Sequence, residues 1–385
     1  MFKKKKCTRM EVTIRQVTSR SDLRAFVKFP EELYKNSPYY VPKIFLDEMG
    51  TLTASSNPAF KFCDTGFFLA YKGDEIVGRV AAIVNNRANA QWNHMEVRYG
   101  WFDFIDDMEV SKALIDTVMD FGRKHGMTSI AGPLGFTDFD AEGMLVEGYD
   151  QICTMPLIYN YPYYPKHMEA MGFTKVVDWL EYKVYLPVGI PEKISKISEL
   201  VSEKYKLHVH KITRWDVIHN NAGGKIFDLI NETYCNLFDF TILPPDLVKK
   251  YINTYIMLVD LKMVSTVEDE EGNMVAFGIS MPSIVRALQK CRGRLFPTGW
   301  FYLIRSMFFR REENLELLLV SVKPEYQSKG VYAMLFNDLI PIYLKYGFKY
   351  AETNAELEDN LKVRGPWDYF EKDQHKRRRV YGKNL

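Results

Sequence analysis

The sequence lacks the features of several common protein classes. It has five cysteines, which are far apart and show no CxxC spacing, so neither a disulfide framework nor a zinc site is expected. The longest apolar stretch, 296–309, is interrupted by Arg305 and is too short to span a bilayer. No apolar segment of a secretory signal follows the basic residues 3–6, so we expect a cytoplasmic protein. No metal is expected.

The charge is nearly balanced. The formal net charge of the 385 residues is +2, which argues against a protein built mainly to bind nucleic acid, and no DNA partner is expected. Hydrophobic residues make up 47% of the chain, which is enough apolar material for two cores. Length and composition therefore favour a globular protein of two domains.

The two halves of the chain contain similar patterns. Residues 67–84 and 263–281 each place two apolar runs around a Gly-Asp or Gly-Asn turn, which predicts a β-hairpin. Residues 113–132 and 335–354 each show an amphipathic helix pattern that ends at a glycine and leads into a strand pattern. These elements predict a mixed α/β sheet covered by helices, present twice. Chance similarity of two α/β halves is the alternative.

The domain boundary is expected near 186–190, where the sequence LPVGI contains proline and glycine and has little periodicity. This boundary gives a first domain over residues 1–186 and a second domain over residues 187–385. The second copy is the longer one, and its extra length falls at 284–311.

One strand-to-helix connection in the second half has the composition of an anion site. The segment 320–336, VSVKPEYQSKGVYAMLF, passes from an apolar strand through Gln327, Ser328, Lys329 and Gly330 into an amphipathic helix. A helix N-terminus has free N–H groups and the positive end of a dipole, and glycine lets a phosphate come close. The pattern therefore predicts an anion-binding loop.

This connection resembles the phosphate loop of the GNAT family, the GCN5-related N-acyltransferases. The family signature is a strand, a [Gln/Arg]-x-x-Gly-x-[Gly/Ala] loop that holds the pyrophosphate of coenzyme A, and a helix. Gln327 and Gly330 match this signature. Tyr332 stands where the family has a small residue, a departure that affects one backbone amide contact.

Other stretches extend the resemblance over most of the chain. Residues 132–173, 351–360 and 381–382 are similar to bacterial tandem-GNAT proteins, whose distant relatives include the bacterial ceramide synthases. The resemblance implies two tandem acyl-CoA N-acyltransferase-like (GNAT) domains in a mixed α/β fold. It also implies acetyl-CoA or a longer acyl-CoA as the co-substrate and an amine as the acceptor.

The resemblance further implies which residues hold the coenzyme. Loop amides would contact the pyrophosphate, and the end of the strand 315–322 would lie beside the pantetheine arm. Lys329 would add charge, or it is a solvated surface lysine. Asn360 would contact the arm, or it only caps a helix. The expected coenzyme-binding residues are Val320, Val322, Gln327, Ser328, Lys329, Gly330, Val331, Tyr332 and Asn360.

Three carboxylates in the second half are candidates for the general base of acyl transfer. In the segment YAETNAEL, Glu352, Asn354 and Glu356 share one face of a predicted strand, where two nearby carboxylates would raise one pKa. The alternative is a solvated face at the end of the strand. Glu316, among leucines on the preceding strand, is the third candidate. Tyr381 is a candidate proton donor to the thiolate, and Asn354 is a candidate substrate contact.

The first half has no equivalent of the phosphate loop. At the matching place, Asp106, Asp107 and Glu109 stand at a helix start, where they would cap the helix and repel a pyrophosphate. We therefore expect a degenerate GNAT-like domain that either lines the substrate cleft or has a structural role. The segment 159–173, rich in tyrosine and proline, is either an aromatic pocket wall or a rigid crossover.

The segment 284–311 is basic and aromatic. It contains seven Lys or Arg residues and no Asp or Glu. This composition on an amphipathic helix predicts peripheral contact with the inner face of a membrane, with Trp300 near the entry of a lipid substrate. The alternative is a clamp between the domains, with its aromatic rings buried and its arginines paired to acids. Nucleic-acid contact fits the near-neutral total charge less well.

Together these features predict an acyl-CoA-dependent N-acyltransferase that transfers an acetyl or longer acyl group to an amine, with its active site in the second half. One alternative is a catalytically silent GNAT-fold protein that binds a ligand or acts as a scaffold, which Tyr332 favours. The other is an aminoacyl-tRNA-dependent transferase, which would not need the phosphate loop.

Overall fold

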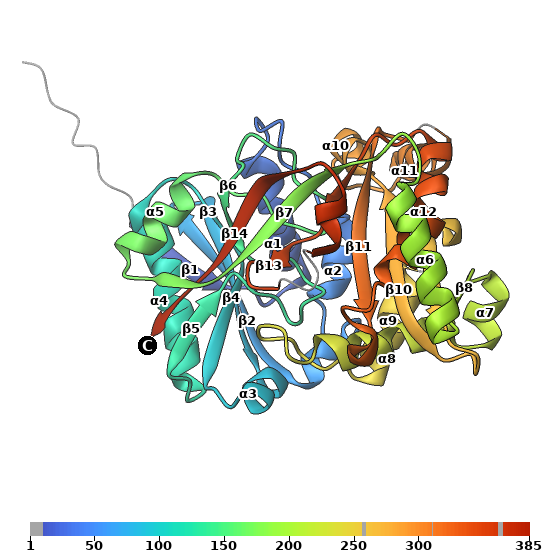
Figure 1. Cartoon of the computed structure of the whole chain (residues 1–385). Helices are drawn as coiled ribbons and strands as arrows, with labels where there is room; N and C mark the ends of the chain where they lie inside the picture. Colours follow the sequence, from blue (N-terminus) through green and yellow to red (C-terminus); the bar gives the residue numbers. More distant parts are fainter. Residues whose placement is uncertain (1–10, 256–258, 310, 361–364) are drawn as a thin grey trace, which may run out of the picture.

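The chain folds around one continuous mixed sheet. In this computed structural model the described residues are 11–255, 259–309, 311–360 and 365–385. The strand order is β1-β2-β3-β4-β5-β14-β7-β12-β11-β10-β9-β8, with β6 beside β14 and β13 beside β7 (Figure 1). The pairs β4–β5 and β11–β12 are parallel, whereas the other pairs are antiparallel. The predicted mixed α/β class is confirmed.

The elements of the first half run from residue 12 to residue 185. They are β1 Val12–Gln16, α1 Arg20–Leu33, α2 Phe45–Thr51, β2 Cys63–Lys72, β3 Glu75–Asn85, α3 Asn86–Trp92, β4 Glu96–Phe104, α4 Met108–Lys124, β5 Ser129–Gly132, β6 Met144–Glu147, α5 Tyr163–Ala170 and β7 Thr174–Tyr185.

The elements of the second half run from residue 192 to residue 384. They are α6 Glu192–Tyr205, β8 His208–His210, α7 Arg214–His219, α8 Ala222–Tyr234, α9 Pro245–Tyr255, β9 Val264–Glu268, β10 Met274–Pro282, α10 Val285–Cys291, α11 Gly299–Ile304, a π-helical turn Arg305–Phe309, β11 Asn314–Val322, α12 Tyr332–Tyr346, β12 Tyr350–Thr353, β13 Glu356–Leu357 and β14 Lys372–Asn384. Among the described residues, no helix has the length and apolarity needed to cross a membrane.

Both halves contain the same unit of hairpin, strand, helix and parallel strand. In the first half this unit is β2–β3, β4, α4 and β5; in the second half it is β9–β10, β11, α12 and β12. Both hairpins form where the sequence predicts them. Gly73 and Gly272 have φ angles of +61° and +79°, a conformation that glycine adopts without steric cost in a tight turn.

Helices cover both faces of each unit. Along β3, Val80 and Ala82 pack with the α4 side of the sheet, while Ala81 and Ile83 pack with α1. Alternate residues of a strand point to opposite faces, so an apolar run on β3 is buried on both sides. The second half repeats this arrangement on β10, with α8 on one face and α12 on the other.

The two halves exchange strands at their junction. β14, the last strand of the chain, lies between β5 and β7, with Tyr381 opposite Gly132 and Arg378 opposite Trp179. β7 then pairs with β12 of the second half. The boundary at residue 186 stays a prediction, and the sheet of the first half includes a strand from beyond it.

Buried charges hold this junction together. Glu181 on β7 is fully buried and lies between Lys376 and Arg378 of β14, with 3.0 Å between its carboxylate and the Lys376 Nζ. Although burial alone would raise the pKa of Glu181, the two cations hold it at about 2. A carboxylate paired in this way stays ionised in the interior, and the removal of either partner is costly.

Candidate functional site

A large cavity lies between the two halves. Its volume is about 1620 Å³, and apolar side chains from both halves make up most of its wall. Sites for small ligands usually measure roughly 300–1,000 Å³. This cavity therefore has room for a ligand with a long chain, or for two ligands side by side.

The β11 strand is distorted where it reaches the cavity. Ile279 and Ser280 of β10 are neighbours, but they pair with Leu319 and Leu317, so Leu318 is an extra residue in β11. Such a bulge bends the strand and redirects its backbone groups. Leu317–Val322 line the cavity from the bulge onward.

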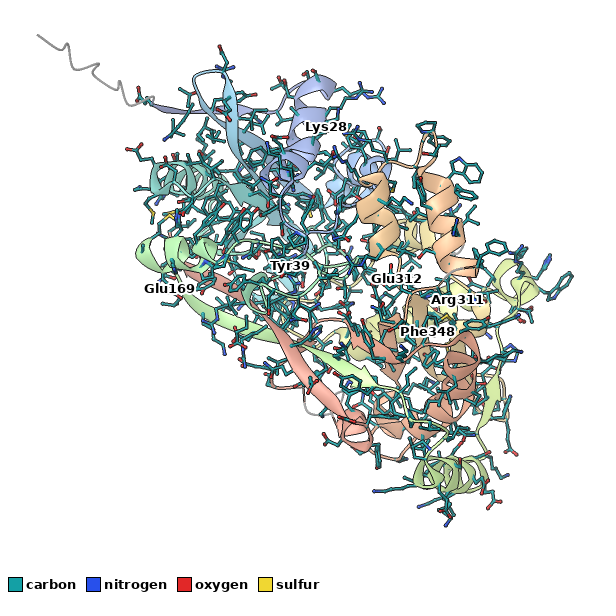
Figure 2. The ribbon with its side chains drawn as sticks, turned by 90° about the horizontal axis from the view of Figure 1, so that it is seen from above. Lys28, Tyr39, Glu169, Arg311, Glu312 and Phe348 are labelled. Atoms are coloured by element: carbon teal, nitrogen blue, oxygen red, sulfur yellow. The ribbon has the colours of Figure 1, made fainter. Side chains whose placement is uncertain are left out.

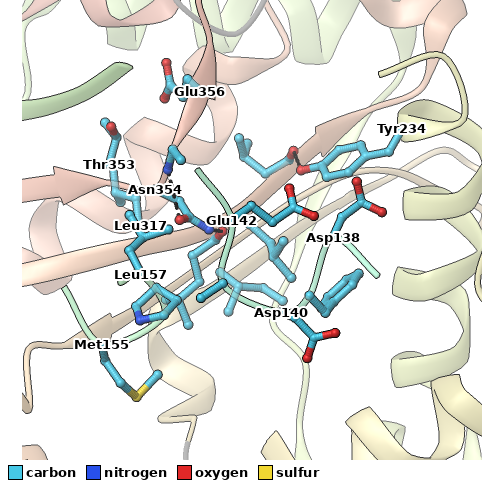
Figure 3. Close-up of a pocket in the computed structure, with 18 of the residues that line it drawn as sticks. Asp138, Asp140, Glu142, Met155, Leu157, Tyr234, Leu317, Thr353, Asn354 and Glu356 are labelled. Atoms are coloured by element: carbon cyan, nitrogen blue, oxygen red, sulfur yellow. Dashed lines mark hydrogen bonds between the residues drawn. The ribbon is translucent and has the colours of Figure 1, made fainter. Parts of the chain in front are cut away.

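The parallel pairing of β11 with β12 ends at the same bulge. The last pair is Leu317 with Thr353, and Asn354 then donates from its backbone N–H to the Leu317 carbonyl (3.1 Å) and from Nδ2 to the Leu318 carbonyl (3.2 Å). Beyond Asn354 the two strands separate, so this edge of β11 opens into the cavity. Figure 3 shows Asn354 and Leu317 together at this opening.

The predicted anion loop follows β11 directly. Ser328 and Gly330 have φ angles of +60° and +84°, and α12 begins without a side-chain cap at Val331. Among the described residues, no protein group accepts a hydrogen bond from the backbone N–H of Gly330, Val331 or Tyr332. The start of α12 therefore offers free donors and the positive end of its dipole.

Neighbouring side chains fix the shape of this loop. The Gln327 amide donates to the Val322 carbonyl at 3.0 Å. A Cβ on Gly330 would lie 2.9 Å from Ile197 of α6, so both φ and space require glycine there. The Lys329 ammonium lies over the Tyr205 and Tyr326 rings, 5.0 and 5.3 Å from their centres. Gln327 and Tyr332 line the cavity.

Three carboxyl groups of the first half face the cavity from the segment 138–142 (Figure 3). Burial raises the pKa of Asp138 to about 7 and that of Asp140 to about 6. Burial, followed by the neighbouring Asp138, raises the pKa of Glu142 well above its usual range. Asp138 and Asp140 therefore exchange protons near neutral pH, as general bases require.

The three carboxyls differ in their hydrogen bonds. Asp140 accepts from the backbone N–H groups of Phe136 (2.9 Å) and Thr137 (3.1 Å), so it holds its own loop. Asp138 accepts from the Thr241 backbone at 3.0 Å. The Glu142 carboxyl has no hydrogen-bond partner among the described residues. Asp138 and Glu142 are thus the groups that remain available to a ligand.

None of these three acids is among the site residues predicted from the sequence. They follow one another at every second position in GFTDFDAEG, a segment with glycine at both ends and no charge of the opposite sign. That spacing could have indicated a functional site, because three carboxyls so close together repel one another unless a ligand or a cation is near.

Among the predicted catalytic residues, Glu356 lines the cavity together with Asn354 and Asn360. Its Oε1 accepts from the Trp367 indole at 2.8 Å. Burial raises the pKa of Tyr332 to about 12, and the negative charge of the nearby Glu356 carboxylate adds to this rise. A phenol with such a pKa is a neutral donor at physiological pH.

Glu352 and Glu316 lie outside the cavity wall. β12 ends at Thr353, so the regular alternation predicted for Glu352, Asn354 and Glu356 stops there. Glu352 instead accepts from Lys376 (3.1 Å) and Asn314 (3.2 Å). Its neighbour in register is Glu316, whose pKa burial and Glu352 raise to about 7. Glu352 therefore interacts with a second carboxylate, as expected, but that carboxylate is Glu316 instead of Glu356.

Two further predicted residues are also away from the cavity. Tyr381 is buried in the first half, where its hydroxyl donates to Glu169 at 3.0 Å. Trp300 is 48% exposed and donates to the Pro297 carbonyl. The structure therefore leaves both outside the group that surrounds the opening of β11.

At the matching place of the first half, the start of α4 is closed. Asp107 is the N-cap of α4 and accepts from the Glu109 backbone at 2.9 Å, and Lys72 forms an ion pair with Asp107. Asp106 bonds to His167. In the tyrosine-rich segment, Tyr159 and Tyr164 both line the cavity and pack with other rings.

No protein-family model matches the sequence. The chain shares 23% identity over 377 residues with the protein YghO of Escherichia coli K12, which covers 97% of this chain and 95% of that protein. It shares 22% identity over 386 residues with a bacterial ceramide synthase of Caulobacter vibrioides, which covers 98% of this chain and 99% of that protein.

Solved structures show the same fold. A tandem GNAT protein from the clavulanic acid biosynthesis pathway superposes with a TM-score of 0.55 at 12% identity, over 97% of this chain and 98% of that chain. A GCN5-related N-acetyltransferase from Sphaerobacter thermophilus gives a TM-score of 0.50 at 9% identity, over 97% and 95%. The chain therefore has the tandem GNAT fold, and the predicted resemblance is confirmed at the level of fold.

Proposed function

We propose that the protein is an acyl-CoA-dependent N-acyltransferase whose active site is the opening between β11 and β12. The observation that carries this proposal is the coincidence of three features at one place. The bulge at Leu318, the end of strand pairing at Asn354 and the uncapped start of α12 all border the same cavity. Together they support an extended pantetheine arm beside β11 and a pyrophosphate at the free N–H groups of α12.

The reaction needs a base for the amine and an acid for the thiolate. Asp138, whose pKa burial raises to about 7, would take the proton of the ammonium form near neutral pH, with Glu142 as the neighbouring carboxyl in the cavity wall. The free amine attacks the thioester carbonyl, the C–S bond breaks, and the thiolate takes a proton. Tyr332 is the proposed donor of that proton, and Glu356 remains a second candidate base because it lines the cavity.

The acceptor in this proposal is a hydrophobic amine, and the acyl group is long. The volume of the cavity and its apolar wall favour such substrates over a small polar amine. The similarity to a protein named bacterial ceramide synthase points the same way, because ceramide is the amide of a fatty acid with a long-chain amine.

Calorimetric titration with acetyl-CoA and with a long-chain acyl-CoA tests the proposal. Ser328 is exposed and has a positive φ, which Asp and Asn tolerate better than most residues. Ser328→Asp places a negative charge beside the expected pyrophosphate and should weaken binding of both ligands about tenfold or more. Ser328→Asn has the same shape without the charge and should bind like the wild type.

Three outcomes would contradict parts of this proposal. If neither ligand binds the wild type, the protein is not an acyl-CoA enzyme, and an aminoacyl-tRNA-dependent transferase takes its place. If the Asp and Asn variants bind equally well, the phosphate site is not at α12. If the coenzyme binds but no thiol is released with short-chain or long-chain primary amines, the chain is a silent binding protein.

A further inference from the structure

The segment between β10 and β11 presents aromatic side chains to solvent. Six large apolar residues of α11 and its flanks, which we call the aromatic surface, are strongly exposed: Phe296 72%, Trp300 48%, Phe301 49%, Ile304 43%, Phe308 43% and Phe309 78%. Figure 2 shows ring side chains on these pale orange helices that point away from the body of the molecule. Monomeric proteins rarely leave so many large apolar side chains together in water without a partner.

The charged residues within the segment 284–311 have one sign. Lys290, Arg292 and Arg305 accompany the aromatic surface, and the whole segment contains no Asp or Glu. Arg294 pairs with Glu31 of α1 at 2.9 Å, and Lys290 lies 4.5 Å from the centre of the Tyr302 ring. For the described residues, no acidic partner contacts Arg292 or Arg305. These two arginines therefore carry positive charges that have no ion-pair partner among the described residues.

The inner side of the same segment is firmly attached to the protein. Leu303 and Met307 are buried, and Ser306 donates to the Ser283 carbonyl. The Gln289 amide donates to the carbonyls of Pro38 and Tyr40 in the first half, both at 2.9 Å. The segment thus does clamp the two halves, as one sequence-based alternative expects, but its aromatic rings lie outside the clamp.

The segment is also part of the cavity wall. Leu295 and Leu303 line the cavity, while residues on either side of them belong to the aromatic surface. Leu46 of α2 is 54% exposed and also lines the cavity, and the adjacent Phe45 N–H donates to the Gly293 carbonyl. A place where the cavity reaches solvent therefore adjoins the aromatic surface.

We propose that the aromatic surface docks onto the surface of an anionic lipid bilayer. Exposed rings insert between headgroups, while Lys290, Arg292 and Arg305 contact lipid phosphates. Charge complementarity selects this occupant, because a purely apolar protein partner would leave the unpaired arginines without counter-charges. The docked orientation brings the Leu46 opening of the cavity close to the headgroups. The inference concerns location and is independent of whether the proposed transferase reaction takes place.

Vesicle flotation of the full-length protein tests this proposal. Wild-type protein should float with vesicles of phosphatidylcholine and phosphatidylglycerol, weakly with phosphatidylcholine alone, and less as the salt concentration rises. Phe296→Ser with Phe309→Ser should lower the partition coefficient about tenfold or more, because two large apolar groups are lost. Both residues are largely exposed, so the fold does not depend on them.

Two further pairs of variants complete the design. Leu200→Ser with Ile218→Ser removes side chains that are 64% and 72% exposed outside the aromatic surface, and should leave partitioning unchanged. Arg292→Gln with Arg305→Gln should lower partitioning into the anionic vesicles about tenfold and leave that into neutral vesicles unaltered.

Several results would overturn the inference. The inference would be wrong if the wild type failed to float with either vesicle type. It would also be wrong if the control pair lost as much partitioning as the Phe296/Phe309 pair. Alternatively, light scattering would show a dimer of the wild type that the Phe296→Ser/Phe309→Ser variant dissociates. A second copy of the chain would then be the occupant of this surface.

Discussion

The two halves of this protein place the same elements around two different strand-to-helix turns. In the first half, Asp107 caps α4 and pairs with Lys72, so the helix start is satisfied within the protein. In the second half, α12 begins at Val331 without a side-chain cap, after a loop that Gly330 allows to turn sharply. The two halves therefore share a scaffold, while a few residues decide whether a helix start is satisfied within the protein or keeps free N–H donors.

Both halves keep the bulge on the strand before that helix. In β4 the extra residue falls between Gly100 and Asp103, where Trp101 has a φ of +43°, and in β11 it is Leu318. The first half thus retains the distortion that opens the strand edge, although its helix start is closed. Its contribution to the cavity includes the acids at 138–142.

The largest expected effect on stability concerns the junction between the two halves. Glu181→Leu leaves Arg378 buried without its carboxylate and Lys376 with Glu352 alone, and should lower the free energy of unfolding by about 3–5 kcal/mol. Urea unfolding measures this change. Glu147→Ala removes a partner of Arg377 that is 58% exposed, and should cost about 1 kcal/mol or less. Equal effects of the two variants would show that the buried ions do not join the halves.

The acids of the first half test whether that half is more than a scaffold. Asp138→Asn with Glu142→Gln should lower the acylation rate about a hundredfold or more, as expected for the loss of a general base. Since the pKa of Asp138 is about 7, the wild-type rate should fall as the pH drops below neutral, and the variant should lose this dependence. Asp150→Asn, an exposed acid, is the control. An unchanged pH–rate profile would assign the base to Glu356.

Glu316 marks a difference between β11 and β4. In β11, Glu316 stands two residues before the bulged Leu318. In β4, Tyr99 occupies the matching place, directly before Gly100. The pKa of Glu316 is raised from its usual 4.5 to about 7 in the folded protein. Between these two pH values, the folded protein holds a proton that the unfolded chain has already released. Stability is therefore lost as the pH rises from about 4.5 to about 7.

Glu316→Gln should remove that loss. The variant should unfold like the wild type at pH 5 and be more stable by on the order of 2 kcal/mol at pH 8. Thermal unfolding at the two pH values measures the difference. A variant that is equally destabilised at both would mean that the carboxylate is needed in its ionised form.

The smallest expected effect concerns the cap of α4. Asp107→Ala should lower the free energy of unfolding by about 1 kcal/mol and leave coenzyme binding unchanged, because the first half has no role there. Asp107→Asn keeps a capping side chain and should recover most of the loss, as denaturant midpoints will show. Weaker coenzyme binding by the Ala variant would mean that the two helix starts are not functionally separate.

Local chemistry explains why the sequence predicted the hairpins and the anion loop. A two-residue turn at Gly73, and Gly330 before an amphipathic run, are decided by neighbours within a few residues. The face shared by Glu352 and Glu356 was predicted from regular alternation, which ends when β12 stops at Thr353. The sequence contains no local signal for that stop.

Long-range pairing explains the rest of what the sequence left unpredicted. The run from Lys376 to Arg379 has the composition of an exposed basic patch, but in β14 its residues alternate between two faces. Lys376 and Arg378 point inward to Glu181, whereas Arg377 and Arg379 bind Asp178. Their acidic partners lie nearly two hundred residues earlier, on a strand whose place beside β14 no local pattern encodes.

The position of β14 has a consequence for the protein during its synthesis. Domains usually complete their folding in the order in which they leave the ribosome. Here β5 and β7 are made early, but the strand that lies between them, β14, is made only after α6 to β13 of the second half. Until then the nascent first half exposes two strand edges that can pair with other chains. The ribosome must therefore synthesise the elements of the second half up to β14 before the sheet of the first half can be closed.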